Sequence, residues 1–169
     1  TNPFFLNKGP YSIKYIFEES PLGTAGALGL LPDQLTQKPL ILMYADLLTK
    51  INFKELLNFH ITEQGKATMC VRKYDFQVPY GVIESNGIKV EKISEKPVHS
   101  FFINAGIYVL NPLLLDLIDG TQNIDMPNLL GSIINTNEKI TFYFNEFINP
   151  LTIVNAIEII NFTDFRIGE

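Results

Sequence analysis

The stretch that decides the fold is PLILMYADLLTK, residues 39–50. Its uninterrupted apolar run, residues 40–44, predicts a strand that is buried on both faces, as in the middle of a parallel sheet. Asp46 follows the end of this strand, and open α/β sheets bind ligands at the carboxyl ends of their strands. Asp46 is therefore either a ligand-binding carboxylate or a plain cap on the next turn.

The composition indicates one globular domain over residues 1–169. The chain is 46% hydrophobic and 18% charged, with a formal net charge of -5, which is typical of a folded protein rather than a disordered one. No run of Lys or Arg suggests a nucleic-acid partner. No apolar stretch has the length of a membrane span, and the first residues do not resemble a signal peptide. We therefore expect a cytoplasmic protein without a membrane partner.

Two potentially reactive side chains have structural interpretations. Cys70 is the single cysteine, which excludes an internal disulfide and a cysteine-based zinc site. The apolar run around it, residues 67–71, predicts a buried, inert thiol. His60 lies on the apolar stripe of a predicted helix and has no His or Cys partner at metal-ligand spacing, so we expect a packed histidine.

The first half of the chain predicts a strand–helix–strand order. Residues 13–17 alternate as a strand, and a small-residue loop then opens a helix over residues 25–31 that Pro32 ends. Asn52 is the expected N-cap of the next helix, with Glu55 reaching back and Gly65 ending it. Residues 67–73 form the next buried strand. Together with residues 40–44, this order predicts a right-handed parallel crossover.

The second half predicts a hairpin followed by further helices and strands. Strands at residues 80–84 and 88–93 are joined by an Asn86-Gly87 turn. Residues 101–110 form a strand in which Gly106 marks a bulge or a close backbone approach. The remaining predicted elements are helices starting at Asn111-Pro112 and at Asp125, a strand at 140–144, and a terminal helix lined by Leu151, Val154, Ile157 and Ile160.

Five stretches, in this order, carry a family resemblance. They resemble the sugar-1-phosphate nucleotidylyltransferases, and among them the mannose-1-phosphate guanylyltransferase-like group that often carries CBS domains. The resemblance implies an α/β fold with a mixed, mostly parallel Rossmann-like sheet flanked by helices, truncated at its N-terminus. The stretches are EESPLGTAGAL (18–28), LILMYADLLTK (40–50), ATMCVRKYDFQVPYGVI (67–83), EKP (95–97) and NAGIYVL (104–110).

The resemblance also implies an activity. Enzymes of this family join a nucleoside triphosphate to a sugar 1-phosphate and release pyrophosphate, with Mg²⁺ as the cofactor. The nearest group implies GTP together with mannose 1-phosphate or a related hexose 1-phosphate. A homo-oligomer is compatible with the family.

The family's site residues fall on ten positions. Asp46 matches the catalytic aspartate that holds Mg²⁺, an ion that prefers carboxylate oxygen; Ala45 stands where the family has a glycine. Each group also has an interpretation without a ligand: a strand-to-helix turn for residues 23–26, a solvated ion pair for residues 95–96, and a strand bulge for residues 104–106. The other matches are Gly23, Thr24, Ala25 and Gly26 (base and sugar), Gly81 (sugar), Glu95 (sugar hydroxyls), Lys96 (sugar phosphate), and Asn104 and Gly106 (sugar).

Two departures leave three hypotheses open. Nothing before Ile13 matches the family's G-G-x-G-T-R phosphate loop, so we expect that loop, its strand and its helix to be missing from this chain. The second metal-binding Asp, expected after residues 145–147, is not found, and Asp164 lies too far along. The chain is part of a catalytic nucleotidylyltransferase, a non-catalytic homologue that binds a nucleotide-sugar or a catalytic partner, or an unrelated α/β binding domain or metal-using glycosyltransferase.

Overall fold

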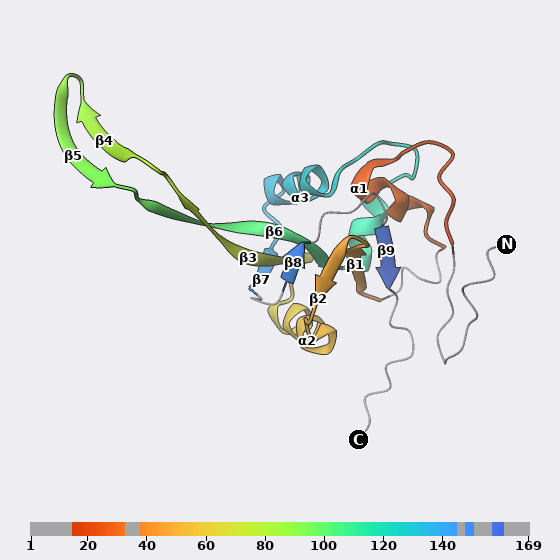
Figure 1. Ribbon diagram of the computed structural model, residues 1–169. Coiled ribbons are helices and arrows are strands. Elements are labelled where there is room, and N and C mark those ends of the chain that lie inside the picture. Colours follow the sequence, from red (N-terminus) through yellow and green to blue (C-terminus); the bar gives the residue numbers. More distant parts are fainter. Residues whose placement is uncertain (1–14, 33–37, 145–147, 151–156, 161–169) are drawn as a thin grey trace.

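The fold is organised around one five-stranded sheet. The computed structural model describes residues 15–32, 38–144, 148–150 and 157–160 (Figure 1). The strand order across the sheet is β7-β3-β6-β1-β9. The strands are β1 (Leu40–Tyr44), β3 (Ala67–Gln77), β6 (Val98–Leu110), β7 (Ile140–Phe144) and β9 (Ile157–Ile160).

The sheet is mixed, as predicted, but it is not mostly parallel. Strand β3 pairs with β7 in parallel, whereas β6 pairs antiparallel with both β1 and β3, and β9 pairs antiparallel with β1. Strands β1, β3 and β7 therefore run in one direction. Strands β1 and β3 are thus parallel strands of one sheet connected through α2, in agreement with the predicted strand–helix–strand unit, and β6 returns from a long hairpin and lies between them.

The helices cover both faces of the sheet. Helices α1 (Gly23–Gly26), η1 (Ala27–Leu30), η3 (Pro112–Leu117) and α3 (Met126–Asn135) contribute to one core, which contains Leu40, Leu42 and Tyr108. Helix α2 (Phe53–Glu63) contributes Leu56 to the other core, with Ile41 and Ile107. Figure 1 shows α1 and α3 on one side of the sheet and α2 on the other. Alternate residues of β1 therefore enter opposite cores, which explains its continuous apolar run.

Helix boundaries follow local chemistry. The Asn52 side chain accepts hydrogen bonds from the backbone N–H groups of Lys54 and Glu55, which confirms the predicted N-cap. Helix α2 ends at Gln64, which takes the left-handed conformation predicted for a glycine, and Gly65 follows it. The helix expected over residues 25–31 starts two residues earlier and splits into α1 and η1. The helix after Asn111 is a 3₁₀ helix.

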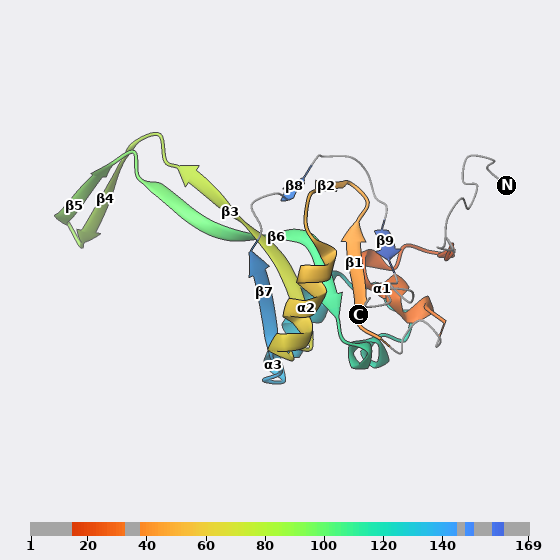
Figure 2. The same ribbon diagram turned by 90° about the horizontal axis from the view of Figure 1, so that it is seen from below.

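A long β-ribbon extends from the body. The outer parts of β3 and β6 continue into a separate hairpin of β4 (Gly81–Asn86) and β5 (Lys89–Glu95). Figures 1 and 2 show this arm projecting away from the helices and from β1. The turn lies at Gly87-Ile88, one residue after the predicted position, and Gly87 has a φ of 60°. A second small sheet pairs β2 (Leu47–Thr49) with β8 (Ile148–Pro150).

Two terminal predictions are wrong where the structure describes them. Residues 15–17 form no strand, and Tyr15 and Phe17 are 75% and 86% exposed. The edge of β1 that such a strand could use pairs with β9 instead. Residues 157–160 form this strand rather than the expected terminal helix. The rest of both predictions, residues 13–14 and 151–156, and Asp164 lie outside the described residues. No helix in the described part of the chain is long and apolar enough to cross a membrane.

Candidate functional site

Asp46 occupies the turn that follows β1. The structure places it between β1 and β2, at the carboxyl end of β1, as the sequence predicts. Its Oδ1 atom is buried and has no hydrogen-bond partner within the described part of the chain. A buried carboxylate oxygen without a partner is unfavourable unless something else binds it. This atom is the clearest sign of a ligand or cation at the site.

Gly106 lies directly against the turn that carries Asp46. It has a φ of +72°, and a Cβ atom built on it would lie 2.7 Å from Tyr44 Cδ2 and 3.1 Å from Leu47 Cδ1. Met69 pairs with Tyr108 and Val71 with Asn104, so three residues of β6 face the single residue between them on β3. The predicted bulge at Gly106 is therefore confirmed. The structure thus brings Gly106 against the two residues that flank the Asp46 turn, and Asn104 lies beside Gly106.

A hydrogen-bonded network supports this bulge. The Gly106 backbone N–H donates to Asn104 Oδ1 over 3.0 Å, and Asn104 Nδ2 donates to the Tyr108 hydroxyl. The hydroxyl oxygens of Tyr108 and Tyr44 lie 3.3 Å apart, and the two rings meet edge to face. Burial, followed by the bond to Tyr44, raises the pKa of Tyr108 above its usual value. Both side-chain heteroatoms of Asn104 thus have protein partners.

The small-residue loop at the start of α1 packs against a distant segment. The Ala25 backbone N–H donates to Ile124 O over 2.9 Å, and the Ile124 N–H donates to Leu22 O over 2.8 Å. A Cβ atom on Gly23 would lie 2.7 Å from Ile124 O, and one on Gly26 would lie 2.7 Å from Gln122 O. Protein backbone therefore occupies the space that these glycines open on that side. Their contact with a base or sugar stays a prediction.

Thr24 caps a helix of which it is not part. Its hydroxyl accepts a 2.8 Å hydrogen bond from the Met126 N–H and lies 3.3 Å from Asp125 Oδ1, to which it donates. Its own N–H donates to the same carboxylate oxygen over 3.1 Å. The side chain of Asp125, the N-cap residue of α3, makes no capping bond. The Thr24 hydroxyl thus supplies the cap, a role that sequence reasoning missed.

The remaining predicted sugar contacts lie together on the arm. A Cβ atom on Gly81 would lie 3.2 Å from Glu95 Oε2, and Lys96 Nζ is 4.0 Å from Glu95 Oε1. The Lys96 N–H donates to Tyr80 O over 3.2 Å. No hydrogen bond or ion pair joins these described residues to Asp46, and Figure 1 shows the arm pointing away from the β1–β2 turn. The structure therefore separates two groups that the sequence predicts to share one ligand.

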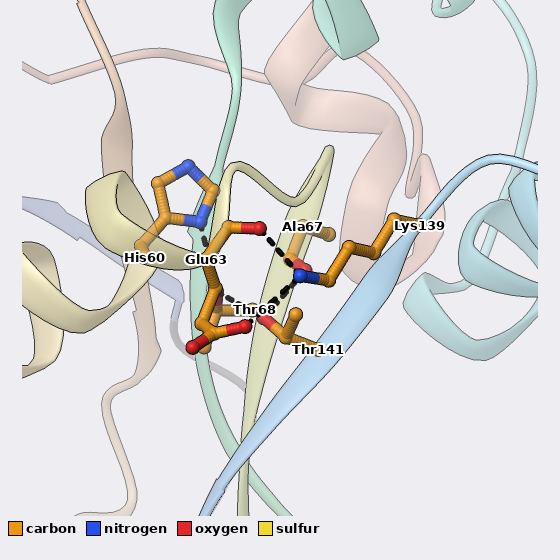
Figure 3. A network of polar contacts seen from close by, with 6 residues as sticks. All are labelled: His60, Glu63, Ala67, Thr68, Lys139 and Thr141. Atoms are coloured by element: carbon orange, nitrogen blue, oxygen red, sulfur yellow. Dashed lines mark hydrogen bonds and ion pairs between the residues drawn. The ribbon is translucent and has the colours of Figure 1, made fainter.

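His60 belongs to a polar network between α2, β3 and β7 (Figure 3). Its Nδ1 atom lies 2.8 Å from Thr68 Oγ1, which lies 2.7 Å from Thr141 Oγ1. Lys139 Nζ donates to both the backbone oxygen of Glu63, over 2.6 Å, and its carboxylate, over 2.9 Å. Burial lowers the pKa of His60. These contacts confirm the prediction of a packed histidine.

Cys70 is also structural. The thiol is buried in the second core cluster. Burial raises its pKa to about 12, so the reactive thiolate is scarcely populated near neutral pH. The prediction of an inert cysteine is confirmed.

The residues present fit a magnesium ion only in part. A carboxylate oxygen such as Asp46 Oδ1 has the hard-donor chemistry that Mg²⁺ prefers, and this ion is often held by one or two carboxylates plus substrate phosphates. Among the residues that the structure describes, no group of three or more His, Cys, Asp or Glu side chains could hold a metal. Asp46 is therefore the ligand that we assign among the described residues, and phosphate oxygens would have to supply others.

The fold is shared with several solved structures. HddC from Yersinia pseudotuberculosis, solved with GMP-PN, superposes with a TM-score of 0.57 at 16% identity, covering 80% of this chain and 60% of that one. A putative glucose-1-phosphate thymidylyltransferase from Bacillus anthracis gives a TM-score of 0.56 at 16% identity, covering 79% and 57%. These likenesses define an α/β fold with a mixed sheet.

The family itself is shown by sequence. The nucleotidyl transferase family model matches residues 6–141, and the chain belongs to this family. It is 43% identical over 112 residues to a probable mannose-1-phosphate guanylyltransferase of Oryza sativa, covering 60% of this chain and 30% of the relative. It is 39% identical over 115 residues to the mannose-1-phosphate guanyltransferase of Debaryomyces hansenii, covering 64% and 32%. The chain thus spans about a third of these relatives.

Proposed function

We propose that the protein acts in nucleotide-sugar synthesis, as a nucleotidyltransferase that joins GTP to mannose 1-phosphate or a related hexose 1-phosphate. The observation that carries this proposal is the buried Oδ1 atom of Asp46 at the end of β1, which has no hydrogen-bond partner among the described residues. Family membership and the similarity to mannose-1-phosphate guanylyltransferases support the choice of substrates. Both proposed substrates are small molecules, so the reaction does not involve DNA or RNA.

The reaction needs positioning and charge neutralisation more than covalent chemistry. An oxygen of the sugar phosphate forms a bond to the α-phosphorus, and the bond from that phosphorus to the bridging oxygen breaks, so pyrophosphate leaves with the electron pair. Mg²⁺, when bound, would neutralise the phosphate charge. Asp46 would hold that ion through Oδ1. The turn between β1 and β2 carries this carboxylate, and Gly106 packs against the residues that flank the turn.

The arm residues have a second role in this proposal. Lys96 Nζ would hold the sugar phosphate as a point charge, and Glu95 would accept hydrogen bonds from the sugar hydroxyls. Their side chains are largely exposed, at 59% and 74%, so both are available to a ligand. Because they lie on the arm rather than at the β1–β2 turn, simultaneous contact would require the arm to bend toward the body.

A second candidate function is nucleotide-sugar binding without catalysis. Two observations favour it: the arm residues lie apart from Asp46, and Asp46 belongs to no group of three or more metal-binding side chains in the described part of the chain. Such a protein would bind the product of the reaction without forming it.

Titration and turnover together test the proposal. The chain is titrated with GTP and with GDP-mannose in Mg²⁺ and assayed for pyrophosphate release. The proposal expects binding of both and turnover that Asp46→Asn abolishes, while Asp116→Asn, an exposed position with the same charge change, leaves turnover intact. Binding of GDP-mannose without turnover would favour the second candidate. Binding of neither ligand would refute both.

A further inference from the structure

The bulge in β6 fixes the orientation of the Asn104 amide. The backbone N–H of Gly106 points at one end of this amide over 3.0 Å, and only the amide oxygen can accept that bond. The amide nitrogen must therefore be the end that faces Tyr108, where it donates to the hydroxyl oxygen. The direction of the first side-chain bond in the network is thus set by the backbone.

The buried hydroxyl of Tyr108 passes this direction on. Tyr108 is 0% exposed, and its oxygen already accepts from Asn104. Its proton therefore needs an acceptor, because a buried donor without one is unfavourable. In the part of the chain that the structure describes, the one acceptor in reach is the Tyr44 hydroxyl oxygen, 3.3 Å away. Tyr108 must donate to Tyr44 rather than the reverse.

The consequence is a hydroxyl donor on Tyr44 that the described network does not use. Tyr44 accepts from Tyr108, so its own hydroxyl proton is not used by any bond described within the network. The side chain is half-buried at the end of β1, two residues before Asp46. We propose that the Tyr44 hydroxyl donates a hydrogen bond to an acceptor oxygen of the bound nucleotide or sugar phosphate. Asn104 is then a positioning residue that acts through Tyr108. This inference rests on the proposed function.

The direction of the hydroxyl chain can be tested without a ligand. Urea unfolding is measured for the wild-type chain, Tyr44→Phe, Asn104→Asp and the double variant. Tyr44→Phe removes the acceptor of the buried Tyr108 proton, so the folding equilibrium constant should fall by about tenfold or more. An aspartate at position 104 supplies a new acceptor, so the double variant should recover most of that loss. A double variant no more stable than Tyr44→Phe would overturn the proposed direction.

The ligand contact is tested by titration in Mg²⁺. GDP-mannose should bind Tyr44→Phe about tenfold more weakly than the wild-type chain, the loss of one hydrogen bond. Tyr74→Phe, which removes an exposed hydroxyl from β3, should bind as the wild type does. Titrations with GDP and with mannose 1-phosphate then show which half of the ligand carries the acceptor oxygen. Equal affinity of Tyr44→Phe and the wild type for all three would overturn the contact.

The double variant adds a readout that a merely structural Asn104 would not affect. Asn104→Asp reverses the direction of the hydrogen bonds, because Tyr108 then donates to the aspartate. Tyr44 therefore donates to the Tyr108 oxygen, and only an oxygen lone pair of Tyr44 faces the ligand. Its effect on GDP-mannose affinity should therefore shrink in the Tyr44→Phe background, where no hydroxyl remains to be reversed. The same loss in both backgrounds would refute the positioning role. If the wild-type chain binds none of the three ligands, the proposed function and this contact both fail, whereas recovery in the urea series still supports the direction of the chain.

Discussion

Gly106→Ala is expected to destabilise the protein more than an ordinary glycine substitution. The backbone contributes first: at a φ of +72° an L-residue costs about 1–2 kcal/mol. The new Cβ atom would also lie 2.7 Å from Tyr44 Cδ2, closer than real Cβ contacts allow. Displacing a packed ring costs about 1–3 kcal/mol. The free energy of unfolding should therefore fall by about 2–5 kcal/mol.

Two other glycines separate these contributions. Gly87 also has a positive φ, +60°, but a Cβ atom on it would meet nothing within 4 Å, so Gly87→Ala should show the backbone cost alone, about 1–2 kcal/mol. Gly131 lies inside α3 with nothing within 4 Å of its added Cβ. Gly131→Ala should therefore stabilise the protein by up to about 1 kcal/mol.

Urea unfolding of the four proteins checks this ranking. If Gly106→Ala and Gly87→Ala lose the same free energy, the contact between β6 and the Asp46 turn is not tight, and the support that we assign to Gly106 is refuted. A second reading comes from GDP-mannose titration of the folded variant. A displaced Tyr44 ring should weaken binding, whereas Gly87→Ala, at the tip of the arm, should not.

Three further outcomes follow from the buried polar groups. Burial lowers the pKa of His60, so its contribution to the free energy of unfolding should be complete above the unfolded pKa of about 6.5. Below that pH the free energy should fall by at most about 1.4 kcal/mol per pH unit, until the folded pKa is reached. His60→Gln should flatten this slope in urea melts, and an unchanged slope would assign the pH dependence to other groups. Thr24→Val should lower the free energy of unfolding by about 1–2 kcal/mol, because the cap on α3 is lost. Thr121→Val should lower it less, because the Thr121 hydroxyl bonds only within a local turn. Equal losses in the two variants would contradict the capping role of Thr24. Cys70 should react with a maleimide only as fast as the chain unfolds, and rapid labelling of the native protein would show that the thiol is accessible.

Elements with strong local signals were predictable from sequence. The continuous apolar run of β1, the Asn52 cap of α2 and the Gly106 bulge all reflect short-range chemistry that one stretch carries by itself. Strand neighbours were less predictable. Strand β6 pairs with β1 residues that are 64 to 70 positions away and with β3 residues that are 21 to 43 positions away. Apolar content alone does not distinguish a parallel neighbour from an antiparallel one.

The site shows the same limit in its side chains. The sequence predicts Asp46 at the end of a buried strand, but it does not show that Thr24 caps a helix that begins some hundred residues later. Tyr44 and Tyr108 were counted as strand residues, although a buried tyrosine hydroxyl always needs a partner. That requirement was the available signal, because two tyrosines in two neighbouring apolar strands are candidates to satisfy each other.

Asn104 and Gly106 show why a motif can locate a site without explaining it. The resemblance assigns both residues to direct sugar contact, and the structure places Gly106 against the Asp46 turn with Asn104 hydrogen-bonded to it. Yet the N–H of Gly106 and both ends of the Asn104 amide are engaged within the protein, while the donor left over belongs to Tyr44. A residue type can therefore be required next to a ligand because it orients another side chain. The main effect of substituting Asn104 should therefore be on the hydrogen bond that Tyr44 offers to the ligand, rather than the loss of a direct contact between Asn104 and the ligand.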